Sequence, residues 1–446
     1  MSDRLAPAPG VRLYYLDDAG VLFCEARQEL HLMNTAAALI FSLLEEHGDE
    51  AAIVAGLAPI LGVDADASRE LVRTALVQWR EQGFVGASVI APAPTATPAP
   101  AATASATATP TVATDPTPAS HAAQLPAAAS FATRRYRLLS SRFLLRFSNG
   151  AQVRVVEPIL DHLQEDDVAA TVTSTIDIVD SDGRIGVYHD EKLTATCAAL
   201  DELAPIVKST VWQTVLRDEA YFLDIHAGVV SDGERCLLLP AAPGSGKSTL
   251  TAALAHAGFE FFSDEVALLE DDTLDVLPVP LALCVKDAGI DALAQHFPRL
   301  RALPVHRRGD GKRVVYLPPA REQRPRDERA RRVHALVFPQ YVPGSETALT
   351  PLARPAALQA LLSQCLRVAV RLDCARVERI VSWIAKLPCY ALRVGTSEAA
   401  VAAIETIFPL DRAAKLSSTA QVSSTGKLSS TTELSSTARQ HDCRPP

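Results

Sequence analysis

The sequence lacks several features that would assign it to a particular class of protein. Its eight cysteines include no C-x-x-C pair and no zinc-like spacing, so we expect reduced, mostly buried thiols. No apolar run reaches the roughly 18 residues that a membrane span needs, and the start, MSDRLAPAPG, lacks the pattern of a signal peptide. The formal net charge of -9 disfavours wholesale nucleic-acid binding. We therefore expect a cytoplasmic protein with neither membrane nor nucleic acid as a partner.

Two low-complexity segments divide the 446 residues. Residues 91–131 are almost all Ala, Pro, Thr and Ser, which is typical of a disordered, semi-stiff linker. Residues 410–446 contain four six-residue repeats, KLSSTA, QVSSTG, KLSSTT and ELSSTA, and are expected to be a disordered tail. The composition thus predicts two folded domains, residues 10–90 and residues 132–409.

The small domain has the pattern of an α+β fold. Strand-like runs at 11–18 and 21–33 are separated by a turn at Ala19-Gly20. Asn34-Thr35 is a helix start signal and Gly48 a helix stop signal, and two further helices are expected at 49–61 and 67–83. Two strands and three helices in about 80 residues predict a small winged-helix-like module.

The large domain begins with a different pattern. The residues favour strands at 142–147, 173–180 and 183–190, then a helix at 192–220 and a single strand at 223–230. Strands that alternate with helices predict an α/β fold.

The stretch PAAPGSGKSTL has the composition of a phosphate-binding loop. A buried strand, RCLLLP, precedes it and a helix at 247–256 follows, which is the context that a P-loop requires. Glycines let backbone N–H groups curl around phosphate oxygens, Lys247 reaches the β- and γ-phosphates, and the Ser248 hydroxyl can hold Mg²⁺. The predicted nucleotide-binding residues are Ala241, Gly244, Ser245, Gly246, Lys247, Ser248 and Thr249.

An acidic pair, Asp264-Glu265, follows the next predicted strand, at 259–262, and begins 17 residues beyond Lys247. One helix out and one strand back can return the pair to the phosphates, because ligands of open α/β sheets bind at the carboxyl ends of strands. An acid there either holds Mg²⁺ or takes a proton from an attacking hydroxyl. An exposed acidic pair is the alternative. His226, taken alone, is typical of a core histidine.

Together, His226-Ala227-Gly228, the loop from Ala241 to Ser248 and Ser263-Asp264-Glu265 resemble the HPr kinase/phosphorylase group of P-loop kinases. The resemblance covers most of residues 140–408 and implies an HPr kinase/PEP carboxykinase-like fold that uses ATP and Mg²⁺. It implies catalytic roles for Asp264, His226 and Lys247: Asp264 as the base that activates an acceptor serine, oriented by His226. Ser248 and Glu265 would hold the metal.

The sequence departs from that family in two places. Glu265 stands where HPr kinases carry Asp, and VPLALCVKDAGIDAL replaces their glycine-rich signature. Lys286 within it either reaches a phosphate or is a solvated surface lysine. Residues 299–332 contain 12 Arg/Lys against 4 Asp/Glu. This basic segment is either a docking surface for an acidic partner or a lid that brings Lys312 to the nucleotide phosphates. The alternative is a solvated charged loop.

Residues 11–86 resemble the PqqD-like family, on His31-Leu32-Met33-Asn34-Thr35-Ala36-Ala37 and the closing WREQGFV. That resemblance implies a domain that binds a peptide as an added strand at a sheet edge, here expected between Leu22 and Leu32. The combined prediction is a serine kinase that acts on a peptide or small carrier protein. A nucleotide-switched peptide chaperone and a kinase of a small-molecule hydroxyl stay open. HPr kinases are hexamers, so a homo-oligomer is among the assemblies that the resemblance allows.

Overall fold

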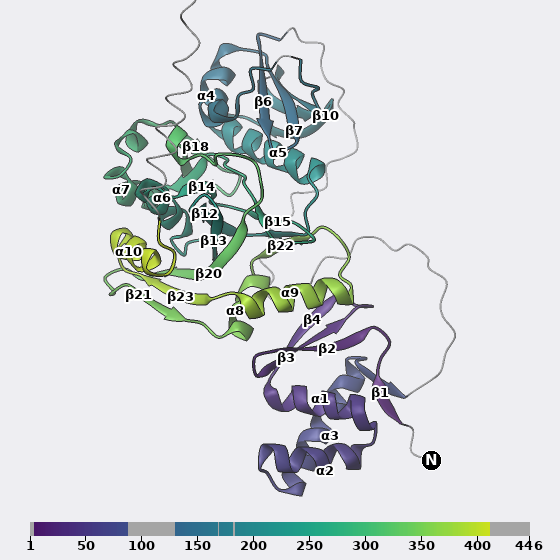
Figure 1. Cartoon of the computed structure of the whole chain (residues 1–446). Coiled ribbons are helices and arrows are strands. Elements are labelled where there is room, and N and C mark those ends of the chain that lie inside the picture. The colour runs from purple at the N-terminus through teal and green to yellow at the C-terminus, as the bar shows by residue number, and fades with distance from the viewer. Residues whose placement is uncertain (1–3, 88–129, 168, 182, 411–446) are drawn as a thin grey trace, which may run out of the picture.

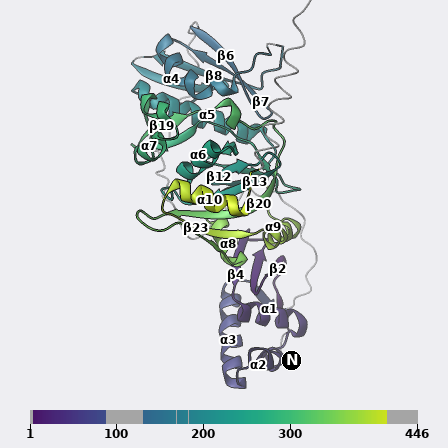
Figure 2. The same cartoon turned by 60° about the vertical axis from the view of Figure 1, so that its left-hand side comes forward.

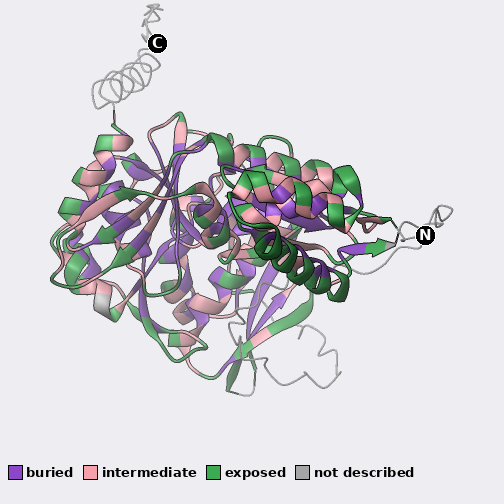
Figure 3. Ribbon diagram, turned by 90° about the horizontal axis from the view of Figure 1, so that it is seen from below, coloured by how far each residue is buried: buried purple, intermediate pink, exposed green. Residues whose placement is uncertain are grey.

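The computed structural model describes residues 4–87, 130–167, 169–181 and 183–410, and they form a mixed α/β protein with several sheets (Figure 1). The predicted linker and the predicted repeat tail lie almost wholly outside these residues. Buried residues concentrate in the strands, whereas the outer faces of the helices are exposed (Figure 3). The α/β prediction is confirmed at this level.

The N-terminal part, residues 4–87, contains the three predicted helices. Asn34 caps the first helix by accepting a hydrogen bond from the Ala37 N–H over 2.8 Å. Gly48 ends the same helix in the left-handed conformation with φ 66°. The helices are α1 (Thr35–His47), α2 (Glu50–Leu61) and α3 (Ala65–Glu81).

The strands of this part differ from the prediction. The first turn lies at Asp17-Asp18 instead of Ala19-Gly20, and the run 21–33 splits into two strands around a turn that places Gln28 at φ 57°. Because β3 pairs with a strand on both sides, the predicted open edge cannot begin at Leu22; the edge strands of this sheet are β2 and β4, and the predicted range overlaps β4. The strands are β1 (Leu5–Pro7), β2 (Val11–Leu16), β3 (Ala19–Cys24), β4 (Glu29–Met33) and β5 (Val85–Ala87).

The second part begins with a five-stranded sheet in the order β10-β9-β8-β7-β6, covered by two helices. The predicted helix at 192–220 is wrong in its first third, because residues 192–197 pair with β9 as a strand instead. The elements are β6 (Ala132–Leu138), β7 (Ser141–Phe147), β8 (Ser174–Ser181), β9 (Arg184–His189), β10 (Lys192–Cys197), α4 (Gly150–Leu160) and α5 (Leu203–Asp218).

A six-stranded sheet forms the centre, in the order β14-β12-β13-β20-β23-β21, with β13, β20 and β23 parallel. Alternate residues of β13 face opposite layers: Leu237 and Leu239 pack with α6 and α10, and Leu238 packs with α8 and α9. The elements are β12 (Ala227–Ser231), β13 (Arg235–Pro240), β14 (Glu260–Ser263), β20 (Arg332–Tyr341), β21 (Ala348–Pro351), β23 (Cys389–Val394), α6 (Lys247–Ala257), α8 (Arg354–Leu362), α9 (Cys374–Lys386) and α10 (Ser397–Ile407).

Two small sheets flank the centre, in the orders β16-β15-β11-β22 and β17-β19-β18. The predicted single strand at 223–230 is two strands, β11 and β12, which belong to different sheets and break at His226. The elements are β11 (Leu223–Ile225), β15 (Ala267–Leu269), β16 (Val276–Leu277), β17 (Leu283–Lys286), β18 (Val305–Arg307), β19 (Arg313–Leu317), β22 (Cys365–Val368) and α7 (Asp287–Ala294).

The N-terminal part packs its β2-β3-β4 sheet against α8 and α9, and both cartoon views place it there (Figure 2). Leu16, Val21 and Phe23 are almost wholly buried in one apolar cluster with residues of both helices. The Gln28 side chain forms two hydrogen bonds with the backbone of Leu372. Its amide N donates to the Leu372 carbonyl over 2.9 Å, and its amide O accepts from the Leu372 N–H over 2.8 Å. The two parts therefore share a core.

In the part of the chain that the structure describes, no individual helix combines the length and apolar character needed to cross a membrane. One consecutive pair, α2 and α3, meets the combined criterion of length and composition but bends by 120° between the two helices.

Candidate functional site

The loop between β13 and α6 leads from the central sheet directly into a helix N-terminus. Gly244 and Gly246 adopt φ 93° and φ 86°, a conformation that other residues rarely tolerate. Tyr341, the last residue of β20, holds the loop from outside by donating its N–H to the Ser245 carbonyl over 2.9 Å. A Cβ on Gly246 would lie 3.0 Å from the Tyr341 Cβ, so this close approach also requires glycine.

This loop has the donor set that an anion needs. Helix α6 begins after Gly246 without a side-chain cap, so the N–H groups of its first turn have no partner within the helix. The Ser245 hydroxyl oxygen is buried and has no hydrogen-bond partner among the described residues. N–H groups without a partner in the helix and a positive helix end together fit a phosphate group.

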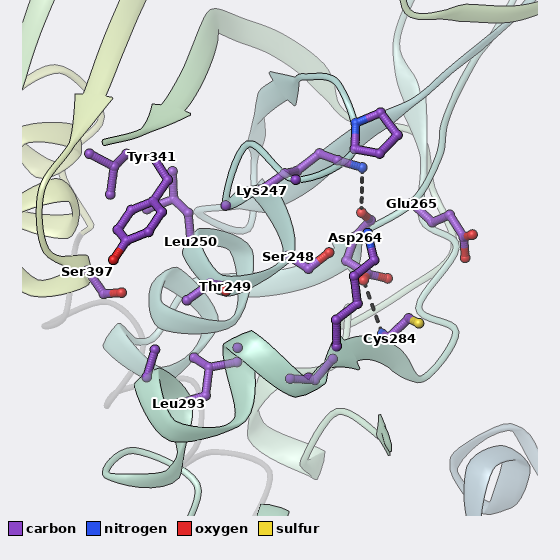
Figure 4. Close-up of a pocket in the computed structure, with 18 of the residues that line it drawn as sticks. Lys247, Ser248, Thr249, Leu250, Asp264, Glu265, Cys284, Leu293, Tyr341 and Ser397 are labelled. Carbon is purple, nitrogen blue, oxygen red and sulfur yellow. Dashed lines mark hydrogen bonds between the residues drawn. The ribbon is translucent and has the colours of Figure 1, made fainter. Parts of the chain in front are cut away.

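Lys247 is the buried cation of the site. Its Nζ donates to Nε2 of His226 over 3.0 Å. It also donates to the main-chain carbonyl of Asp264 over 3.0 Å (Figure 4). Burial lowers the pKa of Lys247 to about 8, although the Asp264 and Glu265 carboxylates oppose the shift. The ammonium is still mostly charged at neutral pH.

His226 occupies the break between β11 and β12. Burial and the charge of Lys247 lower the pKa of His226 to about 4, so the ring is neutral and its Nε2 accepts from Lys247. The sequence predicted that His226 orients Asp264. In the structure the His226 ring contacts Lys247 instead, because the strand break turns residue 226 toward the first residue of α6.

Asp264 and Glu265 differ sharply in environment. Asp264 is 3% exposed and accepts a hydrogen bond from the Cys284 N–H over 3.1 Å. Burial raises the pKa of the Asp264 carboxyl, while the charge of Lys208 opposes that shift. Glu265 is half-exposed and accepts from the Lys208 ammonium over 2.8 Å, and this charge lowers the pKa of Glu265 to about 2. The pair thus offers one proton acceptor with a raised pKa and one permanent anion.

A cavity of about 410 Å³ connects these groups. Figure 4 shows Tyr341, Leu250 and Ser397 at one end, Ser248 and Thr249 in the middle, and the Asp264-Glu265 pair at the other end. The cavity is lined by the predicted site residues His226, Gly244, Gly246, Lys247, Ser248, Thr249, Asp264 and Glu265, but not by the predicted residues Ala241 and Ser245. The structure thus brings the separate sequence motifs to one cavity.

Sequence reasoning missed three residues of this region. Lys208 lies on α5 with no motif around it, and Tyr341 ends β20, a strand that the sequence patterns did not indicate. Arg308 lines the cavity, whereas Lys312, the predicted phosphate contact of the basic segment, does not. Lys312 instead donates to Asp310 over 2.8 Å. Lys286 lines the cavity, which favours the first of its two readings.

Gly228 lies where β12 touches α6. A Cβ on this residue would meet the Thr251 hydroxyl oxygen at 2.2 Å and the Lys247 Cγ at 3.3 Å. Because real Cβ atoms do not approach so closely, the absence of a side chain at 228 lets α6 lie directly on the strand that follows His226.

No model of a known protein family matches this chain, and no curated protein matches it either. Among the described residues, no three His, Cys, Asp or Glu side chains gather as a protein-only metal site. Mg²⁺ at phosphate sites takes only one or two protein ligands beside phosphate and water. The Ser248 hydroxyl and the Glu265 carboxylate, both in the cavity lining, fit that requirement.

Proposed function

We propose that this chain is an ATP-dependent serine kinase of the HPr-kinase-related type, built on a P-loop fold, whose N-terminal winged-helix-like module binds a peptide or small carrier protein. The observation that carries the proposal is the meeting of Lys247, Ser248 and Asp264 in one cavity beside a glycine loop and a helix N-terminus. A nucleotide phosphate, a metal and an acceptor hydroxyl each have a matching group there.

The proposed reaction uses these groups in defined roles. The loop amides and Lys247 hold the β- and γ-phosphates, and Ser248 would hold a Mg²⁺ ion, which would supply charge neutralisation when bound. The acceptor hydroxyl oxygen attacks the γ-phosphorus, the bond to the β,γ-bridging oxygen breaks, and Asp264 takes the hydroxyl proton. Burial supports Asp264 as this base, since the best general bases have a pKa near the working pH.

The role proposed for His226 is to position Lys247. A neutral imidazole that accepts from the ammonium holds the side chain of Lys247 without adding a competing positive charge. Lys208 has a similar supporting part, because its ammonium pairs with Glu265 and lies 5.4 Å from the Tyr316 ring centre.

The N-terminal module supports capture of a peptide through β4 (Glu29–Met33). Among the described residues β4 pairs with β3 alone, so its other edge offers backbone N–H and C=O groups to an added strand. Because the module docks on α9, the captured peptide rather than the linker has to span the distance to Asp264.

The test is transfer of label from γ-labelled ATP in the presence of Mg²⁺ and lysate of the native host. The proposal expects a labelled band that carries phosphoserine and is absent with the Lys247→Met variant. If ATP binds but neither protein nor small molecule becomes labelled, a nucleotide-switched peptide chaperone replaces the kinase.

A further inference from the structure

Arg308 brings a second cation to the Asp264 end of the cavity. It follows β18 directly and lines the cavity together with Lys286, Asp264 and Glu265. Its side chain is 35% exposed, so the guanidinium is neither sealed in the core nor free in solvent. Arg308 has no role in the reaction proposed above.

The hairpin between β18 and β19 fixes the backbone of Arg308. Its N–H donates to the Lys312 carbonyl, and its carbonyl accepts from the Gly311 N–H, both over 2.9 Å. Gly311 closes this turn with φ 77°. Within the hairpin, the buried ring of His306 on β18 lies 5.5 Å from the ring of Tyr316 on β19. The position of residue 308 is therefore set by a rigid element.

Arg308 lies close to the residues that surround the proposed base. The Cys284 N–H donates to the Asp264 carboxylate over 3.1 Å, and Cys284 and Arg308 both line the cavity. The positive charge of Arg308 helps to lower the pKa of the Glu265 carboxyl, which follows Asp264 in the chain. The guanidinium is thus near enough to the acid pair to act on it electrostatically.

The Arg308 guanidinium is weakly engaged in the absence of ligand. Its ion pair with Asp310 spans 3.5 Å, and Lys312 takes the shorter contact to the same carboxylate, 2.8 Å. Lys208, by contrast, is buried and bound to Glu265. Arg308 consequently has donors to spare for an incoming oxyanion at this end of the cavity.

We propose that Arg308 contacts the phosphoryl group during its transfer and stabilises the charge on its equatorial oxygens. This inference rests on the proposed kinase function. A planar guanidinium matches phosphate oxygens with two parallel N–H donors, and an arginine in this role accelerates phosphoryl transfer by roughly 10³–10⁵-fold. Lys247 binds the leaving side from the loop, and Arg308 binds the transferring group from the acceptor side.

The test compares affinities for Mg–ADP and for Mg–ADP with aluminium fluoride, a mimic of the phosphoryl group in transfer, by calorimetry. The wild type is expected to bind the mimic at least about 100-fold more tightly than ADP, as transition-state analogues do. Arg308→Ala should lose most of this difference while keeping its ADP affinity within about threefold, because Arg308 contacts only the transferring group. Arg308→Lys should recover part of the affinity difference between the mimic and ADP.

The neighbouring residue provides the matched control. Arg307 is exposed and pairs with Glu202 over 3.0 Å, outside the cavity lining. Arg307→Ala should therefore behave as the wild type, and the melting temperatures of both variants report on folding.

The results distinguish a failure of the role proposed for Arg308 from a failure of the kinase proposal. Equal discrimination by wild type and Arg308→Ala overturns the role of Arg308 alone. A wild type that binds no ADP, or binds the mimic no more tightly than ADP, overturns the kinase proposal and this inference with it.

Discussion

The Lys247 ammonium donates to Nε2 of His226 over 3.0 Å, although the two residues lie on opposite sides of β13 in the sequence. Burial lowers the pKa of both side chains, to about 8 for Lys247 and about 4 for His226, so one is charged and the other neutral at pH 7. The contact holds the Lys247 side chain at the loop before any phosphate arrives.

Nucleotide affinity should weaken as the pH rises above about 8. The pKa of Lys247 is lowered to about 8, so the free protein loses this charge as pH passes that value, and phosphate binding has to restore the proton. The Kd for Mg–ADP should rise about tenfold per pH unit between pH 8.5 and 9.5. Calorimetry at several pH values measures this slope.

Lys247→Arg is the control, because arginine stays charged throughout this range. Its Mg–ADP affinity, whatever its size, should not change between pH 7 and 9.5. A wild-type Kd that is constant over the same interval contradicts the account of Lys247.

Lys208→Met should move the acid limb of the pH profile of kcat/KM to higher pH. The charge of Lys208 lowers the pKa of Asp264, so its removal raises the pKa of this base and demands a higher pH for deprotonation. Lys208→Arg keeps the charge and should keep the wild-type limb. If Lys208→Met lowers the rate equally at all pH values, Lys208 has only a structural part.

Gly228→Ala should destabilise the fold. Its Cβ would lie 2.2 Å from the Thr251 hydroxyl oxygen, so α6 has to move away from β12 at a cost of roughly 1–3 kcal/mol. Thermal unfolding measures the effect. Combining it with Thr251→Ala should recover part of the loss, and Gly86→Ala, whose Cβ would meet nothing within 4 Å, serves as control. An unchanged melting temperature for Gly228→Ala contradicts the close approach.

The N-terminal part should stay bound after the chain is cut between the two parts. A protease site placed within residues 100–115 allows cleavage, and gel filtration then tests association. Because Leu16, Val21 and Phe23 are buried against the second part, the fragments should elute together. Fragments that separate when the wild-type contacts are intact would refute the shared core.

A paired comparison locates the interface. Replacing both Tyr14 and Gln28 with Ala removes three hydrogen bonds to residues 372 and 374, so on dilution the fragments should separate at a higher concentration than those of the wild type. Tyr15→Ala removes a neighbouring ring that is 52% exposed and should have no such effect.

Local signals predicted much of this structure. The cap residues Asn34 and Gly48 set the bounds of α1, and the strand, glycine loop and helix around Lys247 appear where the composition indicated. These elements depend on neighbours in sequence, such as a capping side chain or a glycine with positive φ, so the sequence carries their information directly.

The missed features depend on neighbours in space. Residues 192–197 form a strand because β9 offers an edge to pair with, and β11 and β12 separate because each joins a different sheet. Lys208 reaches the site from α5 with no motif around it. Arg308 lies in the basic segment 299–332, in which we expected Lys312 to face the phosphates. The contact of His226 with Lys247 was missed for the same reason, because it depends on the break between β11 and β12.

The measurement that tests the central claim most directly compares wild type with Asp264→Asn in Mg–ATP binding and in single-turnover phosphoryl transfer. Asparagine can still accept from the Cys284 N–H but cannot take a proton, so transfer should fall at least about 100-fold while the Kd for nucleotide changes less than about threefold. Transfer at the wild-type rate, or loss of binding and transfer together, would contradict a phosphotransferase that uses Asp264 as its base.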